Sequence, residues 1–137
     1  MALEEYVEVD FSIPDLTMDD ISKNLGISKK TLYKHFKDKD DIVVTLMKLD
    51  TEMEKVLMEE TCCVSSNAIE ETYAFSSIII EKLKDLNSSV MYDMEKYHPK
   101  AWDIFVEHKR GYVYHCIKTN LERGLKEGLY RSNLNPD

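Results

Sequence analysis

The sequence predicts an all-α protein made of a small N-terminal helix-turn-helix domain and a larger helical bundle. Only 4 of its 137 residues are glycine and 3 are proline, whereas 43% are hydrophobic, a composition that favours helices over sheets or disorder. Apolar residues recur at spacings of three and four through most of the chain, as they do in amphipathic helices. The net charge is −8, yet residues 21–37 hold five lysines and no acid. This change of charge divides the chain into residues 1–46 and residues 47–137.

Two short helices are expected before residue 26. The apolar residues of the first helix recur at every fourth position: Leu3, Val7 and Phe11. Pro14 ends that helix, because proline lacks the backbone N–H that a helix interior needs. Thr17, followed three residues later by Asp20, predicts the start of the second helix, since each side chain can cap a backbone N–H of the other residue.

A tight turn and a third short helix follow. Leu25 ends the apolar face of the second helix, Gly26 breaks its period, and Ser28 offers a hydroxyl that can cap the next helix. Leu32 and Phe36 form the inward stripe of that helix. Its outward face carries donor or phosphate-reaching side chains: Lys29, Lys30, Thr31, Tyr33, Lys34 and His35. Lysines alone would also suit a solvated helix face, but with the turn and the cap they favour a helix-turn-helix that reads the DNA major groove.

A long fourth helix is expected from Asp38 to about Glu60. The acids of its first turn suit the positive end of the helix dipole. Apolar residues at alternating spacings of four and three then form a stripe that we expect to be buried: Ile42, Leu46, Leu49, Met53 and Val56. Residues 61–67 are expected to form the turn after this helix.

The remaining helices are expected to complete a bundle. A fifth helix ends near Asn87 and a short segment follows over residues 90–97. The last helix begins at Pro99 and stops at Gly128. The predicted buried stripe of the fifth helix is Ile69, Tyr73, Ile79 or Ile80, Leu83 and Leu86. The predicted buried stripe of the last helix is Trp102, Val106, Val113, Ile117 and Leu121.

Five short runs between residues 17 and 39 match a known pattern: Thr17-Met18-Asp19-Asp20-Ile21, Leu25-Gly26-Ile27-Ser28, Thr31-Leu32-Tyr33, His35-Phe36 and Lys39. Residues 17–46 therefore resemble the tetracycline-repressor (TetR) family of bacterial regulators. The resemblance implies that the start of the third helix reaches base edges, while flanking side chains contact the DNA backbone. With the outward face described above, it predicts these DNA-binding positions: Thr17, Ser28, Lys29, Lys30, Thr31, Tyr33, Lys34, His35 and Lys39.

The resemblance also implies a ligand-responsive repressor that binds a palindromic operator as a homodimer and is released by a small-molecule effector. The connection over residues 11–17 departs from the family pattern, since it is about three residues shorter and lacks the customary glycine. Family members usually continue into further helices that form the dimer interface, whereas this sequence stops at Asp137 and so looks truncated. We therefore expect a weak dimer or a monomer in which Val113, Ile117 and Leu121 are exposed.

Aromatic and methionine side chains gather in the later helices. Such side chains suit a ligand pocket between bundle helices, but they are equally typical of a plain core. The candidate pocket residues are Tyr73, Met91, Met94, Trp102, Phe105 and Tyr112.

Other classes of protein find little support. No nucleophile, base and orienting group stand at a catalytic spacing, and no cofactor motif is present. His108 and His115 would lie about 10 Å apart along one helix, too far to share a metal ion. No apolar run reaches the roughly 20 residues of a membrane span, and residues 1–5 do not resemble a signal peptide, so we expect a cytoplasmic protein. A helical protein-interaction module with a vestigial DNA-binding head remains the alternative.

Overall fold

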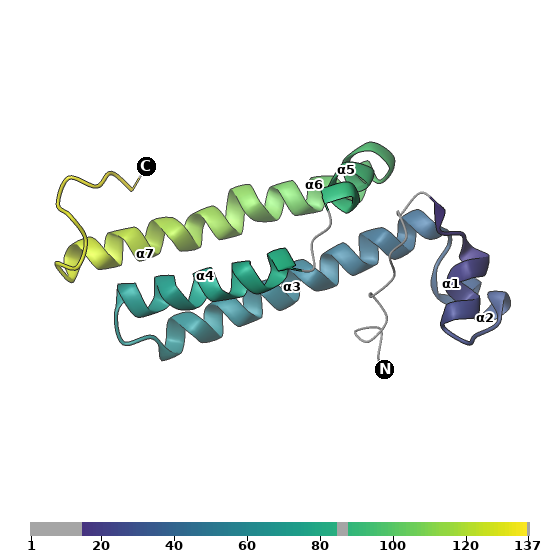
Figure 1. Ribbon diagram of the computed structural model, residues 1–137, viewed down its shortest axis with the longest axis horizontal. Helices are drawn as coiled ribbons and strands as arrows, with labels where there is room; N and C mark the ends of the chain where they lie inside the picture. The colour runs from purple at the N-terminus through teal and green to yellow at the C-terminus, as the bar shows by residue number, and fades with distance from the viewer. Residues whose placement is uncertain (1–14, 85–87, 137) are drawn as a thin grey trace.

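The computed structural model describes residues 15–84 and 88–136 (Figure 1). Within these two ranges the regular secondary structure is helical, and no residue is in a β-strand. The elements are α1 (Met18–Asn24), α2 (Lys29–His35), α3 (Lys39–Val64), α4 (Ala68–Lys84), α5 (Ser88–Tyr97), α6 (Pro99–His108), the π-helical turn η2 (Lys109–Val113) and α7 (Tyr114–Lys126). This confirms the predicted fold class. The helix predicted around Leu3, Val7 and Phe11 lies outside the described residues.

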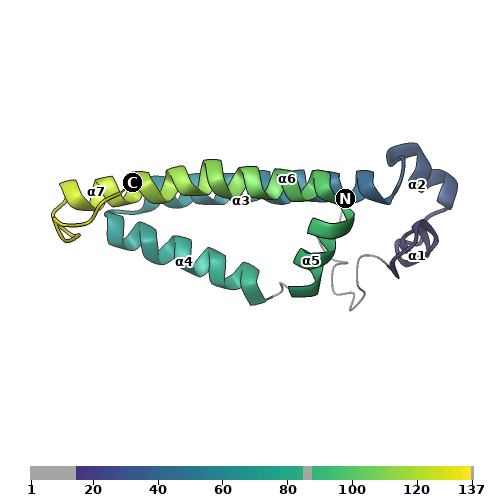
Figure 2. The same ribbon diagram turned by 90° about the horizontal axis from the view of Figure 1, so that it is seen from above.

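The molecule is elongated, with α1 and α2 forming a head at one end (Figure 1). From the head, α3 runs to the far end, α4 returns beside it, and α5 leads back to α3. The elements α6, η2 and α7 follow without a break as one rod along α3 (Figure 2), and α7 packs on α4. The predicted domain division after Leu46 falls inside α3, which passes from the head into the body as one 26-residue helix.

The face of α3 that meets the body is not the predicted stripe. Leu46, Leu49, Met53 and Val56 are exposed, and Ile42 is half-buried. The buried residues of α3 are instead Thr51, Glu54 and Met58. The spacing prediction was correct in grouping the apolar residues on one face of the helix, but wrong in placing that face inward. A polar face can be buried when its charges find partners, and Glu54 does so here.

In α4, too, the predicted apolar stripe is exposed and other residues are buried. Its buried residues are Ala68, Glu71 and Phe75, while the predicted stripe is exposed: Ile69, Tyr73, Ile79, Ile80 and Leu83. Leu86 lies outside the described residues.

The stripe of the last helix is only partly buried. Val113 belongs to the small apolar core with Met58 and Phe75, so the expectation that Val113 is exposed was wrong. Ile117 is exposed, and Leu121 is half-buried. The core cluster therefore fills the junction of α3, α4 and η2.

Polar contacts hold much of the remaining α4–α7 interface. Arg123 Nη1 donates to Glu71 Oε2 at 2.8 Å, and Arg123 Nε donates to Glu127 Oε1 at 2.7 Å. Asn120, itself buried, donates from Nδ2 to the backbone oxygen of Ala68 at 3.0 Å. Buried polar groups with satisfied hydrogen bonds specify how two helices pair, because any other register would leave them unpaired.

A single carboxylate of α3 contacts three other elements of the body, α4, α6 and η2. Glu54 of α3 is only 5% exposed. Its Oε2 accepts a hydrogen bond from Lys82 Nζ of α4 at 2.7 Å, and its Oε1 accepts one from Lys109 Nζ of η2 at 2.7 Å. His108 Nε2 lies 3.2 Å from the same Oε1. We refer to Glu54, Lys82, Lys109 and His108 as the Glu54 cluster.

The Glu54 cluster predicts a loss of stability in acid. Burial raises the pKa of Glu54, but the hydrogen bonds from Lys109 and Lys82 lower it more, to about 2 from an ordinary 4.5. Because the folded pKa is lowered, this stabilisation is present above about pH 4.5 and is lost as the pH falls towards 2. The difference corresponds to about 3 kcal/mol of unfolding free energy. Urea titrations from pH 7 to pH 2.5 should show this loss, and Glu54→Gln should flatten it.

Candidate DNA-binding surface and effector groove

The head is built from local capping contacts. Thr17 caps α1: its Oγ1 accepts from the backbone N of Asp20 at 3.2 Å, and the backbone N of Thr17 donates to Asp20 Oδ2 at 3.0 Å. The hydrogen bonds from Thr17 lower the pKa of Asp20. The predicted capping box is therefore present, and it defines where α1 begins.

A glycine turn sets α2 against α1. The backbone N of Gly26 donates to the oxygen of Lys23 at 3.1 Å, and that of Ile27 to the oxygen of Ser22 at 3.0 Å. Gly26 has φ of 63°, in the left-handed region where side chains are strained. Ser28 then caps α2, since its Oγ accepts from the backbone N of Thr31 at 3.0 Å.

One buried residue orients the surface of α2. Leu32 is 1% exposed and is the residue that α2 buries. The other predicted DNA-binding residues on and before α2 are exposed: Ser28, Lys29, Lys30, Thr31, Tyr33, Lys34 and His35. The structure thus brings these side chains together on the outside of the head.

The remaining two predicted DNA-binding residues flank this surface. Thr17 is exposed at the start of α1, and Lys39 is half-buried at the first position of α3. The start of α3 is fixed by Asp38, whose Oδ1 accepts from the backbone N of Asp41 at 2.9 Å. Asp41 Oδ2 in turn accepts from the backbone N of Lys37 at 3.0 Å, which ties the α2–α3 connection to α3.

An acid lies within the basic surface. Asp19, in the first turn of α1, forms an ion pair with Lys29, the first residue of α2. Both side chains are substantially exposed, so the pair contributes little to stability. It does place a negative charge beside one of the predicted base-reading lysines, a contact that sequence spacing alone did not indicate.

The candidate pocket residues do not lie together around one cavity. Met94 is buried, Met91 is half-buried, and Tyr73 is 76% exposed. Trp102 and Phe105 are half-buried and stack with ring centroids 5.4 Å apart.

Two candidate pocket residues contact the Glu54 cluster: Phe105, whose ring lies 5.6 Å from Lys109 Nζ, and Tyr112. The ring of Tyr112 stacks on His108 with centroids 5.6 Å apart, and its hydroxyl donates to the backbone oxygen of Lys55 at 3.2 Å. Burial raises the pKa of Tyr112. These contacts tie the ring to α3 and α6.

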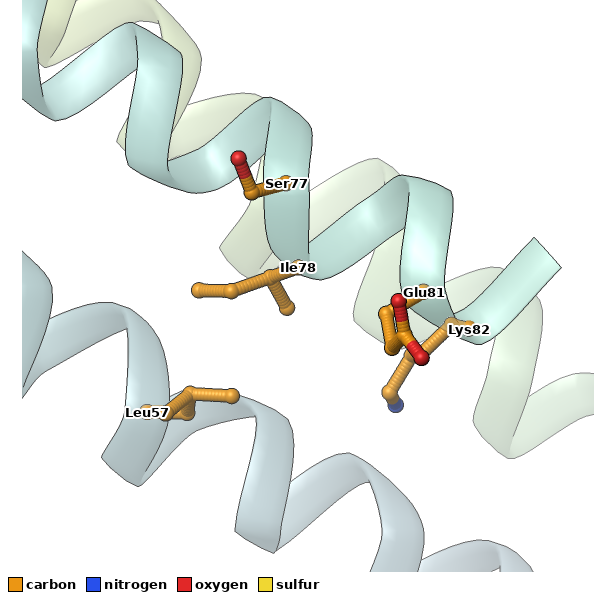
Figure 3. Close-up of a pocket in the computed structure, with 5 residues that line it drawn as sticks. All are labelled: Leu57, Ser77, Ile78, Glu81 and Lys82. Atoms are coloured by element: carbon orange, nitrogen blue, oxygen red, sulfur yellow. The ribbon is translucent and has the colours of Figure 1, made fainter. Parts of the chain in front are cut away.

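A groove between α3 and α4 forms a cavity of about 480 Å³ (Figure 3). Its lining consists of Leu57, Ser77, Ile78, Glu81 and Lys82. Leu57 and Ile78 extend towards each other from the two helices, while Glu81 and Lys82 lie together towards the end of α4. None of the six candidate pocket residues lines this groove.

The residues of this groove lie at no recognisable spacing in the sequence, so sequence reasoning missed it. The sequence offered one usable signal: Asp50 and Glu54 lie four residues apart on a helix, a spacing at which both acids can meet one cation from another helix. Lys82 Nζ contacts both acids, lying 3.0 Å from Asp50 Oδ1 and 2.7 Å from Glu54 Oε2. Lys82 therefore belongs both to the groove and to the Glu54 cluster.

Residues 15–84 and 88–136 contain neither a membrane span nor a metal cluster. No helix in these ranges is both long and apolar enough to cross a membrane. No group of three or more histidine, cysteine, aspartate or glutamate side chains in these ranges can hold a metal ion.

The head matches a family model described as bacterial regulatory proteins, tetR family, over residues 11–46. Over 125 residues, the chain is 26% identical to the uncharacterized HTH-type transcriptional regulator YvaF of Bacillus subtilis (strain 168). That match covers 88% of this chain and 63% of the relative, so the chain spans less than two thirds of the relative's length.

The whole fold also has a counterpart among solved structures. It superimposes on the crystal structure of the TetR family transcriptional regulator PfmR from Thermus thermophilus with a TM-score of 0.67 and 18% identity. That match covers 90% of this chain and 68% of the other. Residues 11–46, which include the capped head and its glycine turn, therefore match the tetR family of bacterial regulatory proteins, and the helical body behind them has the fold of a solved TetR family regulator.

Proposed function

We propose that this protein is a sequence-specific DNA-binding transcriptional regulator, and most specifically a ligand-responsive repressor. The observation that carries the proposal is the exposed basic face of α2, held outward by the buried Leu32 at one end of an elongated molecule. Lysine side chains that can reach guanine O6 and N7 provide sequence reading, and the release of counterions from phosphates provides affinity. Catalytic activity has no part in this function.

We further propose that the protein binds a palindromic operator as a homodimer in the cytoplasm. Two recognition helices read adjacent major grooves when they are held about 34 Å apart, which a two-fold dimer can achieve. A single small head binds more weakly, because it neutralises fewer phosphates.

For the effector we propose a small, mainly apolar molecule that occupies the groove between α3 and α4. Leu57 and Ile78 supply the apolar walls, and Lys82 links the groove to Glu54. An occupant that displaces Lys82 would disturb the contact between α3 and α4, and hence the direction of the head. A second proposal for the effector site keeps the predicted positions Tyr73, Met91, Met94, Trp102, Phe105 and Tyr112.

Selection of bound duplexes from a random pool tests the proposed function most directly. A regulator of this kind should enrich a palindrome whose half-sites are spaced by about one helical turn. Its affinity should fall steeply as the salt concentration rises. Failure to retain any duplex at low salt would contradict the proposal.

Two lysine substitutions should separate base reading from phosphate contact. Lys30→Ala should cost about 1–3 kcal/mol on the preferred operator and relax selectivity at one or two positions. Lys39→Ala should weaken all duplexes alike and reduce the salt slope by about one unit. Fluorescence anisotropy on preferred and scrambled duplexes measures both effects. Equal losses on all duplexes for both variants would remove Lys30 from base reading.

Removing the acid from the basic surface should strengthen DNA binding. Asp19→Asn eliminates a negative charge near the expected phosphates and releases Lys29 from its ion pair. We expect affinity for any duplex to rise by roughly threefold to tenfold at low salt, with a smaller gain at high salt. Glu52→Gln is the control, because Glu52 is an exposed acid of α3 that pairs only with Lys55 among the described ion pairs. Unchanged affinity in Asp19→Asn would show that this edge of the head does not face DNA.

The alternative function is a helical protein-interaction module with a vestigial head. The exposed apolar faces of α3 and α4 favour it, since large exposed apolar surfaces mark interaction sites. Such a module would not select DNA sequences, so the duplex selection also decides between the two functions.

A further inference from the structure

The junction of α5 and α6 contacts the first turn of α3. His98 stands between the two helices, and Figure 2 shows this junction beside the part of α3 nearest the head. His98 is 4% exposed, and its ring Nδ1 lies 3.0 Å from Asp40 Oδ1. An ionised carboxylate only accepts hydrogen bonds, so the ring nitrogen that faces it must be the donor.

Backbone hydrogen bonds anchor His98 at the junction of α5 and α6. The backbone N of His98 donates to the oxygen of Met94 at 2.9 Å, and its oxygen accepts from the backbone N of Ala101 at 3.0 Å. Ala101 is fully buried in α6, the helix that packs along α3. The backbone of His98 is therefore anchored to α5 and α6, while the partner of its ring belongs to α3.

Asp40 is the acid of this turn that reaches the body. The two neighbouring acids make local contacts instead: Asp38 caps α3, and Asp41 accepts a hydrogen bond from the backbone N of Lys37. The side chain of Asp40 is 37% exposed and also lies 3.9 Å from Lys100 Nζ, a mostly exposed cation. The buried imidazole is the better-placed partner, both in distance and in burial.

The contact between His98 and Asp40 lies where the head joins the body, so it can affect the orientation of the head. Asp40 directly follows Lys39, and α1 and α2 precede it along the chain. A small rotation of the first turn of α3 therefore moves the whole α2 surface relative to the body. We propose that His98 is a positioning residue, which fixes the first turn of α3 to the body and so sets the direction in which α2 is presented.

Hydrogen exchange of the full chain tests this link without DNA. His98→Leu removes the donor while keeping most of the volume, and Asp40→Ala removes the acceptor. Each should speed exchange of the backbone amides of residues 41–46 by about tenfold, with no change in α4 and α7. His98→Asn places an amide donor near the position of Nδ1 and should restore most of the protection. Lys100→Ala is the control for the exposed cation and should leave these amides unchanged.

The double variant His98→Leu/Asp40→Ala should exchange no faster than either single variant, because both remove the same contact. Additive effects would overturn the proposal. So would equal behaviour of His98→Leu and His98→Asn, or faster exchange throughout the body, since these results would mean that His98 acts only as a packed core residue.

The consequence for DNA rests on the proposed function and is measured separately. Positioning matters only when two heads must match two half-sites, so His98→Leu should weaken binding to the palindrome by about tenfold and leave binding to a single half-site unchanged. Equal losses on both duplexes would contradict a positioning role. If the unsubstituted protein retains no duplex, the proposed function fails, and the exchange rates still decide whether His98 holds α3.

Discussion

Replacing Glu54 with alanine should lower the free energy of unfolding by about 3–5 kcal/mol, which is the cost of breaking a buried ion pair by removing one partner. Glu54 is 5% exposed and accepts hydrogen bonds from Lys82 and Lys109. Without its carboxylate, these two ammonium groups and the buried His108 are left around an empty site. Urea denaturation followed by circular dichroism measures the loss.

Glu52→Ala is the matched control on the same helix. Glu52 is exposed and pairs with Lys55 at 3.4 Å, so its removal should cost less than about 0.5 kcal/mol. Glu54→Gln keeps the shape and one acceptor, and should therefore fall between the two. A loss below about 1 kcal/mol for Glu54→Ala would show that the Glu54 cluster does not hold the helices of the body together.

Replacing Gly26 with valine should abolish sequence-specific DNA binding. Gly26 has φ of 63°, and a Cβ at this position would meet no atom within 4 Å. The cost therefore comes from the backbone, at about 1–2 kcal/mol, with β-branching adding to it. A head of this size has few contacts with which to offset that strain, so the turn should open and α2 should lose its orientation. Operator affinity, measured by anisotropy, should fall by more than about tenfold.

Gly128→Val provides a control with the same kind of strain in another place. Gly128 has φ of 71°, and a Cβ there also meets nothing within 4 Å. It follows α7 at the end of the molecule far from the head. Its substitution should lower the melting temperature to a similar extent and leave DNA affinity intact. Full DNA affinity in Gly26→Val would mean that α2 does not depend on this turn.

The head could be predicted from the sequence because its determinants are local. Thr17 and Asp20 cap each other across three residues, Gly26 supplies the left-handed turn, and Ser28 caps α2. Each contact joins residues so close in the chain that the residue types and spacing specify it. The same reasoning located the start of α3 at Asp38. It also anticipated the long last helix, although not the π-helical turn within it.

The body shows what the sequence did not decide. Helical periodicity correctly placed Leu49, Met53 and Val56 on one face of α3, but that face is exposed. The body instead buries Thr51, Glu54 and Met58, which lie on another side of the helix.

By itself, the sequence determined the all-helical class, the capped head, the basic outward face of α2 and the resemblance of residues 17–46 to the tetR family. Only the tertiary structure decided which helix faces are buried, where the groove lies and which residues tie the head to the body. The contact between His98 and Asp40 joins residues 58 positions apart, and that between Lys109 and Glu54 joins residues 55 apart. Periodicity states which side chains share a face, but the free energy of burying that face depends on the partners that other helices bring to it. A carboxylate can be buried when two ammonium groups meet it, and no local pattern records that they will.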